Sequence, residues 1–192
     1  MKKYLILLLT FVSFDVLAHE SSLLGFRSGL FHPVLGLDHL LAMVSVGIVS
    51  YQIGNRAIWL VPSTFVIVMA IGGAIGLATS GLLGVEFGIA LSVCVLGFSI
   101  AKSSILKLPL IYLFVCIFSF FHGYAHGQEI PELATSWSYV VGFMIGTALI
   151  HILGVFIGSI FEKYKHGFEV AKALGYTFLG MGVHMILSML GL

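Results

Sequence analysis

The sequence predicts an all-α membrane protein that crosses a bilayer six times after an N-terminal signal peptide. Hydrophobic residues make up 59% of the 192 residues and charged residues only 9%, and the mean hydropathy is +1.13. A soluble domain carries about a quarter charged residues. Six apolar segments also approach the length of about 20 residues that a helix needs to cross a bilayer.

The first 18 residues have the pattern of a secretory signal peptide. Two lysines follow the initiator methionine, and the apolar run 4–14 is too short to span a bilayer. Val16 and Ala18 occupy the small-residue positions before a cleavage point. Cleavage after Ala18 would make His19 the first mature residue, whose amine and imidazole could capture a metal ion. An uncleaved signal anchor is the alternative.

Residues 19–192 are predicted to form a single transmembrane domain. The six spans cover residues 34–51, 57–80, 85–101, 108–127, 138–161 and 170–192. The first, third and fifth connections hold six Lys and Arg residues, whereas Arg27 is the only one on the opposite side. Positive residues stay in the cytoplasm, so both mature termini are expected on the outer side of a bacterial-type inner membrane. A cleaved signal peptide requires the same orientation.

The composition excludes several other classes of protein. A formal net charge of +1 provides no basic surface for nucleic acid. Cys94 and Cys116 lie in apolar runs and do not form a disulfide framework. The connections are too short for an ATPase domain, and no Walker-type glycine loop is present on this chain. Glycines four residues apart, at 72 and 76, 142 and 146, and 154 and 158, predict close helix packing.

A first polar cluster lies at the outer start of the first span. Its sequence is His-Pro-x2-Gly-x-Asp-His over residues 32–39. Pro33 suits a first helical position. On such a helix His32 and His39 share one face, and Asp38 lies one step round. Ionisable groups at membrane depth are costly and usually mark a pathway or a site.

A second polar cluster lies near the end of the fourth span. His122 and His126 are four residues apart and Glu129 follows, so all three share a face if the helix continues. Gly127 and Pro131 indicate that the helix ends close to Glu129. Because the fourth span runs outward, both clusters are expected at similar depth on the outer side of the membrane.

The residue types in the two clusters favour a divalent metal ion. Neutral imidazole and carboxylate oxygen suit nickel, cobalt or zinc, and the lack of paired thiolates argues against Cu(I). Glu86 could line an entrance on the same side. His151 and His184 are ambiguous between a site and a helix-to-helix hydrogen bond. A membrane haem protein with His39 and His126 as axial ligands, or an intramembrane zinc hydrolase, are the competing functions.

The ordered pair of motifs resembles the HupE/UreJ family of nickel and cobalt permeases. The first motif is followed by Met43 and Gly47, and the second reads Phe-His-Gly-x-Ala-His-Gly-x-Glu. The resemblance extends over nearly the whole chain. It implies a secondary transporter rather than an enzyme, with Ni²⁺ or Co²⁺ as substrate and no cofactor. The residues that it implies as metal ligands are His32, Asp38, His39, His122, His126 and Glu129.

Overall fold

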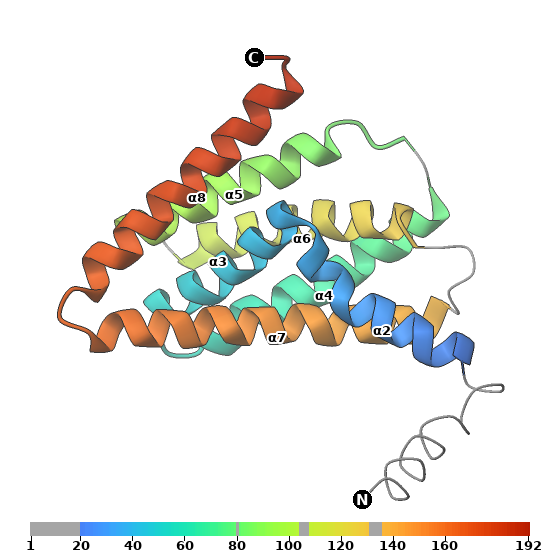
Figure 1. The fold of residues 1–192 in the computed structure, drawn as a ribbon, viewed down its shortest axis with the longest axis horizontal. Helices are drawn as coiled ribbons and strands as arrows, with labels where there is room; N and C mark the ends of the chain where they lie inside the picture. The colour runs from blue at the N-terminus through green and yellow to red at the C-terminus, as the bar shows by residue number, and fades with distance from the viewer. Residues whose placement is uncertain (1–19, 80, 104–107, 131–135) are drawn as a thin grey trace, which may run out of the picture.

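The computed structural model describes residues 20–79, 81–103, 108–130 and 136–192. Within these residues the chain forms seven helices and no strand (Figure 1). They are α2 (Glu20–Leu35), α3 (Leu37–Ile53), α4 (Ala57–Ala78), α5 (Val85–Lys102), α6 (Leu108–Gln128), α7 (Ser136–Lys163) and α8 (Gly167–Met189). The predicted signal peptide and His19 lie outside the described residues.

Five of these helices are long and apolar enough to cross a membrane, namely α4 to α8. Their ends differ from those of the predicted spans by no more than three residues. The α2–α3 pair gives a sixth candidate span if the two helices are counted together. The prediction of a polytopic all-α protein is therefore confirmed for the described residues.

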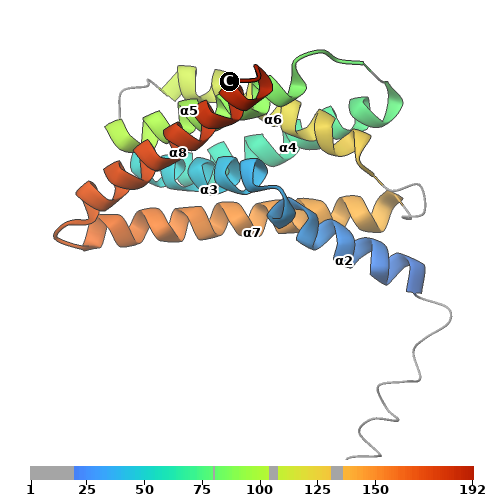
Figure 2. The same ribbon diagram turned by 45° about the horizontal axis from the view of Figure 1, so that its top comes forward.

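The prediction for the first span is wrong in its local structure. Pro33 does not start a helix but lies in the last turn of α2, which began at Glu20. Gly36 then separates α2 from α3 with extended backbone angles, φ −91° and ψ 116°. The two helices are bent by 82° at this break, so His32 and His39 lie on different helices (Figures 1 and 2).

The break has a physical cause in two neighbouring residues. Pro33 has no backbone N–H and its ring disfavours helix around it. Gly36 has a low helix propensity, because its unfolded backbone has more freedom to lose. The new helix starts at once, since the Leu40 N–H donates to the Gly36 carbonyl at 2.9 Å.

Helix α3 lies at the centre of the bundle. It contacts α2, α4, α5, α6 and α7, and ten of its residues are buried. The closest helix pairs are α4 with α6, α5 with α8, and α7 with both α2 and α3. In Figure 2 α7 runs below α3 and is crossed by α2, so one long helix contacts both halves of the broken span.

Glycines allow the closest of these helix crossings. A Cβ atom on Gly76 of α4 would lie 2.3 Å from the Tyr124 carbonyl oxygen of α6, and one on Gly72 would lie 2.5 Å from that of Phe120. On α6, a Cβ on Gly123 would lie 2.0 Å from the Met69 carbonyl oxygen. The two backbones are therefore in direct contact, as small residues permit in membrane bundles. This confirms the packing interpretation of the glycine pairs.

We expect Gly76→Ala to destabilise the protein by about 1–3 kcal/mol, because the added methyl group forces α4 and α6 apart. Gly180→Ala on α8 is the matched control, since no atom lies within 4 Å of the added methyl group. Thermal unfolding in detergent measures both, followed by the reaction of buried Cys94 with a thiol-specific dye in proteins whose second free cysteine, Cys116, is replaced by alanine. Equal melting temperatures for the two variants would contradict this account of the α4–α6 contact.

Candidate metal site

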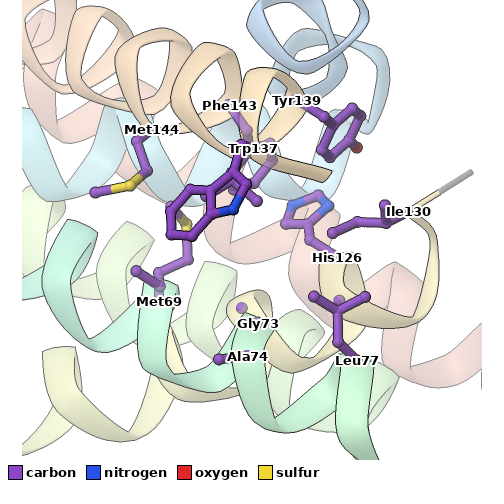
Figure 3. Close-up of a pocket in the computed structure, with 14 residues that line it drawn as sticks. Met69, Gly73, Ala74, Leu77, His126, Ile130, Trp137, Tyr139, Phe143 and Met144 are labelled. Atoms are coloured by element: carbon purple, nitrogen blue, oxygen red, sulfur yellow. The ribbon is translucent and has the colours of Figure 1, made fainter. Parts of the chain in front are cut away.

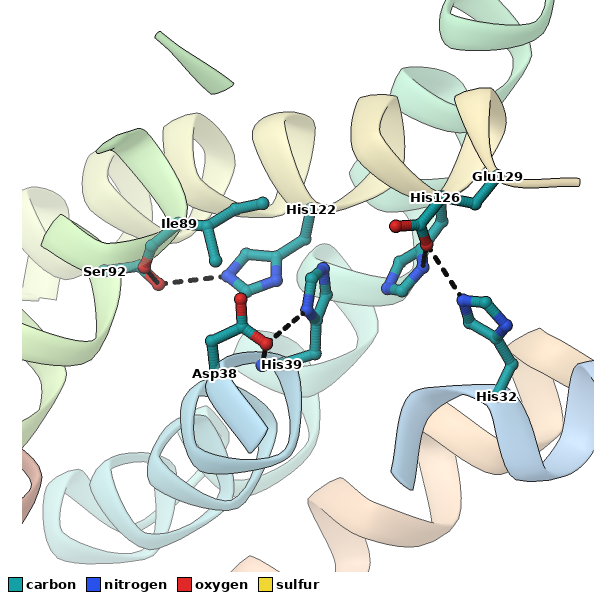
Figure 4. A network of polar contacts seen from close by, with 8 residues as sticks. All are labelled: His32, Asp38, His39, Ile89, Ser92, His122, His126 and Glu129. Carbon is teal, nitrogen blue, oxygen red and sulfur yellow. Dashed lines mark hydrogen bonds and ion pairs between the residues drawn. The ribbon is translucent and has the colours of Figure 1, made fainter. Parts of the chain in front are cut away.

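The two predicted clusters meet in space. His32 of α2 places its Nε2 3.0 Å from an oxygen of Glu129, just after α6. The Nδ1 of His126 lies 3.3 Å from the same carboxylate oxygen. Potential ligand atoms of these three residues lie within 4.8 Å of one another, which is close enough to hold one metal ion. We call His32, His126 and Glu129 the outer triad (Figure 4).

The outer triad is the part of the site that solvent reaches. The Glu129 side chain is 53% exposed and that of His32 26%, whereas His126 is buried. The imidazoles of His126 and His32 beside it hold the pKa of the Glu129 carboxyl well below its usual range. The triad therefore presents an anionic oxygen to solvent, with the less exposed imidazoles beside it.

Two further histidines continue from the outer triad into the bundle. The His39 ring centroid lies 4.2 Å from that of His126 and 4.8 Å from that of His122. The His32 and His126 centroids are 4.9 Å apart. Four imidazole rings thus contact one another in a continuous row, which we call the histidine row. Its members, from the exposed end inward, are His32, His126, His39 and His122. Its inner members are buried, with His122 fully inaccessible to solvent.

Asp38 orients His39. The Nδ1 of His39 lies 2.8 Å from Oδ1 of Asp38, which also accepts the His39 backbone N–H at 2.8 Å. With Nδ1 donating to the carboxylate, the lone pair of the ring is on Nε2. That Nε2 is buried and has no hydrogen-bond partner. A carboxylate that fixes the tautomer of a histidine is the usual support of a metal-binding imidazole.

Ser92 of α5 has the same effect on His122. Its hydroxyl donates to the Ile89 carbonyl at 2.6 Å and lies 3.0 Å from Nε2 of His122. The hydroxyl proton is thus engaged, so Nε2 of His122 is the donor to Ser92 and the ring's lone pair is on Nδ1. This Nδ1 is also buried without a partner. Ser92 lies outside both motifs, and no pattern in the sequence connects it with His122. Only the structure identifies it as a partner of this histidine.

Buried imidazoles with unpartnered nitrogens are unusual. Most buried polar atoms in proteins are hydrogen-bonded, and exceptions need an explanation. Nitrogens without partners occur here in His39, His122 and His126. The His39 ring contacts the other two, so the arrangement offers several unpartnered nitrogen donors close together. Such donors suit a divalent transition-metal ion.

The structure also places Glu86 near the triad. Glu86 in the first turn of α5 is exposed. Together with Glu129 it lines a cavity of about 360 Å³ formed by residues 81–86 and the end of α6. A second carboxylate thus lines the same cavity as Glu129 of the outer triad.

An apolar cavity of about 540 Å³ borders the other side of His126. It lies between α4, α6 and α7, with Trp137, Tyr139 and Phe143 near the imidazole (Figure 3). Tyr139 and Phe143 also pack against His32, at centroid distances of 5.8 and 6.0 Å. Sequence reasoning did not identify these two aromatic residues, whose four-residue spacing on α7 is ordinary for a buried face.

The geometry argues against a haem held by His39 and His126. Axial histidines flank the iron on opposite faces of the porphyrin. The centroids of these two rings are only 4.2 Å apart, which leaves no space for a macrocycle between them. His184 and His166 are exposed, unlike the inner members of the row.

Comparisons with known proteins agree with the two motifs. Residues 6–185 match the family described as HupE / UreJ protein. The chain is 42% identical over 151 residues to Protein HupE of Rhizobium leguminosarum bv. viciae, which covers 79% of this chain and 78% of that protein. No solved structure shows significant similarity to the chain. The match over most of its length shows that the chain belongs to the HupE/UreJ family.

Proposed function

We propose that this chain is a permease that carries Ni²⁺, or Co²⁺ as the alternative substrate, across the inner membrane into the cytoplasm. The observation that supports this most strongly is the histidine row. It connects an exposed anionic triad to buried imidazoles with unpartnered nitrogens. Family membership supports the same substrate class. In this proposal the ion is cargo, and the chain is not an enzyme.

The ion first meets carboxylates and then imidazoles. Glu86 and Glu129 attract the hydrated ion at their shared cavity. His32, His126 and Glu129 replace part of its water shell. His39, oriented by Asp38, and His122, oriented by Ser92, then receive it at their free nitrogens. His19 would add a capture point if the signal peptide is removed.

The membrane potential is a sufficient driving force for such a carrier. Each charge gains about 2.3 kcal/mol per 100 mV, so a divalent ion gains about 4.6 kcal/mol. This corresponds to more than a thousandfold accumulation, at about 1.4 kcal/mol per factor of ten. The chain therefore needs no ATPase domain for uptake.

We expect His126→Ala and Asp38→Ala to reduce Ni²⁺ uptake at least tenfold in cells that express the protein. The first change removes the imidazole shared by the triad and the inner histidines, and the second frees His39 from its orienting carboxylate. Radioactive Ni²⁺ uptake, normalised to protein in the membrane, measures this, with Co²⁺, Zn²⁺ and Mg²⁺ as competitors.

His166→Ala is the control for uptake, because this histidine is exposed between α7 and α8. It should transport like the wild type. Saturable uptake that persists in both site variants would refute the site, and no uptake by the wild type would refute the function. Wild-type turnover of a peptide or lipid with tightly retained zinc would instead favour a hydrolase.

We expect Ser92→Ala to weaken Ni²⁺ binding about 10- to 100-fold, the usual effect of removing a partner that orients a metal-binding histidine. Ser99→Ala is matched, since Ser99 lies on the same helix and donates only to the Val95 carbonyl. Calorimetric titration of the detergent-purified proteins compares the affinities. An unchanged Ni²⁺ affinity of Ser92→Ala would show that His122 is not a ligand of the ion.

We also propose that residues 1–18 are cleaved and that both mature termini face outward. Intact-mass measurement of the purified protein should then give a chain that begins at His19. Ala18→Leu should block cleavage and retain the full mass, because a bulky residue disfavours processing. A wild-type mass that includes residues 1–18 would instead establish an uncleaved anchor.

A further inference from the structure

One face of α7 continues the histidine row deeper into the bundle. Tyr139, Phe143, Thr147 and His151 recur at every fourth residue, and all four are buried. Tyr139 and Phe143 contact the outer triad through His32 and His126. At about 1.5 Å per residue, His151 lies roughly 12 Å further along α7 than Phe143. The face therefore extends from the site described above toward the Lys163 end of α7.

Helix α4 packs two residues against the inner part of this face. The Met69 sulfur accepts a hydrogen bond from the Thr147 hydroxyl at 4.0 Å. One turn away, the Phe65 ring centroid lies 5.0 Å from that of His151 and 5.7 Å from that of His122. His151 is thus one side chain removed from the innermost member of the histidine row.

His151 has no structural role that accounts for an imidazole. Its side chain is 1% exposed. Its polar contact is with the backbone of Thr147 in the preceding turn, and no other described residue reaches either ring nitrogen with a hydrogen bond of ordinary geometry. An interhelical hydrogen bond, the other role considered from the sequence, is therefore not made. A leucine would fill this position without leaving buried polar atoms unpaired.

His151 borders a cavity on one of its sides, the side that faces α4. On the α3 side, a Cβ on Gly47 would lie 2.2 Å from the His151 carbonyl oxygen, so the two backbones are in contact. On the α4 side, His151 borders a cavity of about 340 Å³ that reaches Ile58 and Trp59 in the first turn of α4. That turn lies at the end of α4 opposite to Thr79, whose carbonyl accepts a hydrogen bond from Gln128 beside the outer triad.

We propose that His151 is the ligand of a second, transient metal site on the inward path, with Thr147 and Met69 as its neighbours. This inference rests on the proposed function. The imidazole is the group that suits Ni²⁺ and related transition-metal ions, because Mg²⁺ and Ca²⁺ favour sites made of oxygen ligands. The imidazole, hydroxyl and thioether groups are neutral, so the site holds the ion more weakly than the carboxylate-containing outer triad. Conduction requires sites that the ion can leave again.

The test separates binding from translocation. His151→Leu keeps side-chain volume and removes the ring nitrogens, and His151→Met also restores one soft ligand atom. We expect both to bind Ni²⁺ with affinity within twofold of the wild type in calorimetric titration. In proteoliposomes that contain an entrapped Ni²⁺-sensitive dye, His151→Leu should lose at least tenfold in transport rate, and His151→Met should recover part of it.

His184→Leu on the exposed face of α8 is the matched control and should retain wild-type transport. A purely structural role for His151 predicts a different result, namely a lower melting temperature of His151→Leu with a normal rate per folded molecule. That result would overturn the inference. Loss of Ni²⁺ binding in His151→Leu would also overturn it, because His151 would then belong to the outer site. Failure of the wild type to transport Ni²⁺ would be a failure of the proposed function instead.

Discussion

The break at Gly36 is the constraint on which the geometry of the site depends. In a straight helix, His32 and His39 would lie about 10.5 Å apart along the axis, at about 1.5 Å per residue. Their partners His122 and His126 are only four residues, or about 6 Å, apart on α6. The 82° bend between α2 and α3 removes this mismatch. His32 can thus contact His126 while His39 contacts both histidines of α6.

Close backbone packing then fixes the two sides of the site relative to each other. Helix α7 contacts both α2 and α3, and its aromatic residues pack against His32 and His126. Helix α6 is held against α4 by glycines on both helices. Since a bulkier residue at these crossings would displace a whole helix, the positions of the imidazoles depend on glycines that have no ligand atom of their own. The geometry of the candidate site therefore depends on packing residues as well as on the proposed ligands.

Much of this arrangement can be predicted from the sequence. The features that cannot be predicted depend on local choices of helix ending and on tertiary packing. The length and hydropathy of α4 to α8 determine their existence, and the two motifs identify the residues that meet. The break was not predictable from Pro33, which suits the first turn of a helix and is also tolerated near an end. Ser92 and His151 come together with the row only through tertiary packing, so their spacing along the chain carries no signal.

In the proposed permease, the distribution of charge along the ion path gives the site its direction. Carboxylates occur at the outer end, at Glu86 and Glu129, with Asp38 one step further in. Beyond them the buried polar groups are imidazoles and a hydroxyl in place of carboxylates: His122, Thr147 and His151. A carboxylate in the low-dielectric interior would bind a divalent ion strongly and hinder its release. Neutral donors keep the ion partly ligated after it loses water, yet leave the membrane potential able to move it onward. In this proposal carboxylates and imidazoles together begin the dehydration of the ion at the outer triad, and imidazoles without a carboxylate ligand follow where the ion must keep moving.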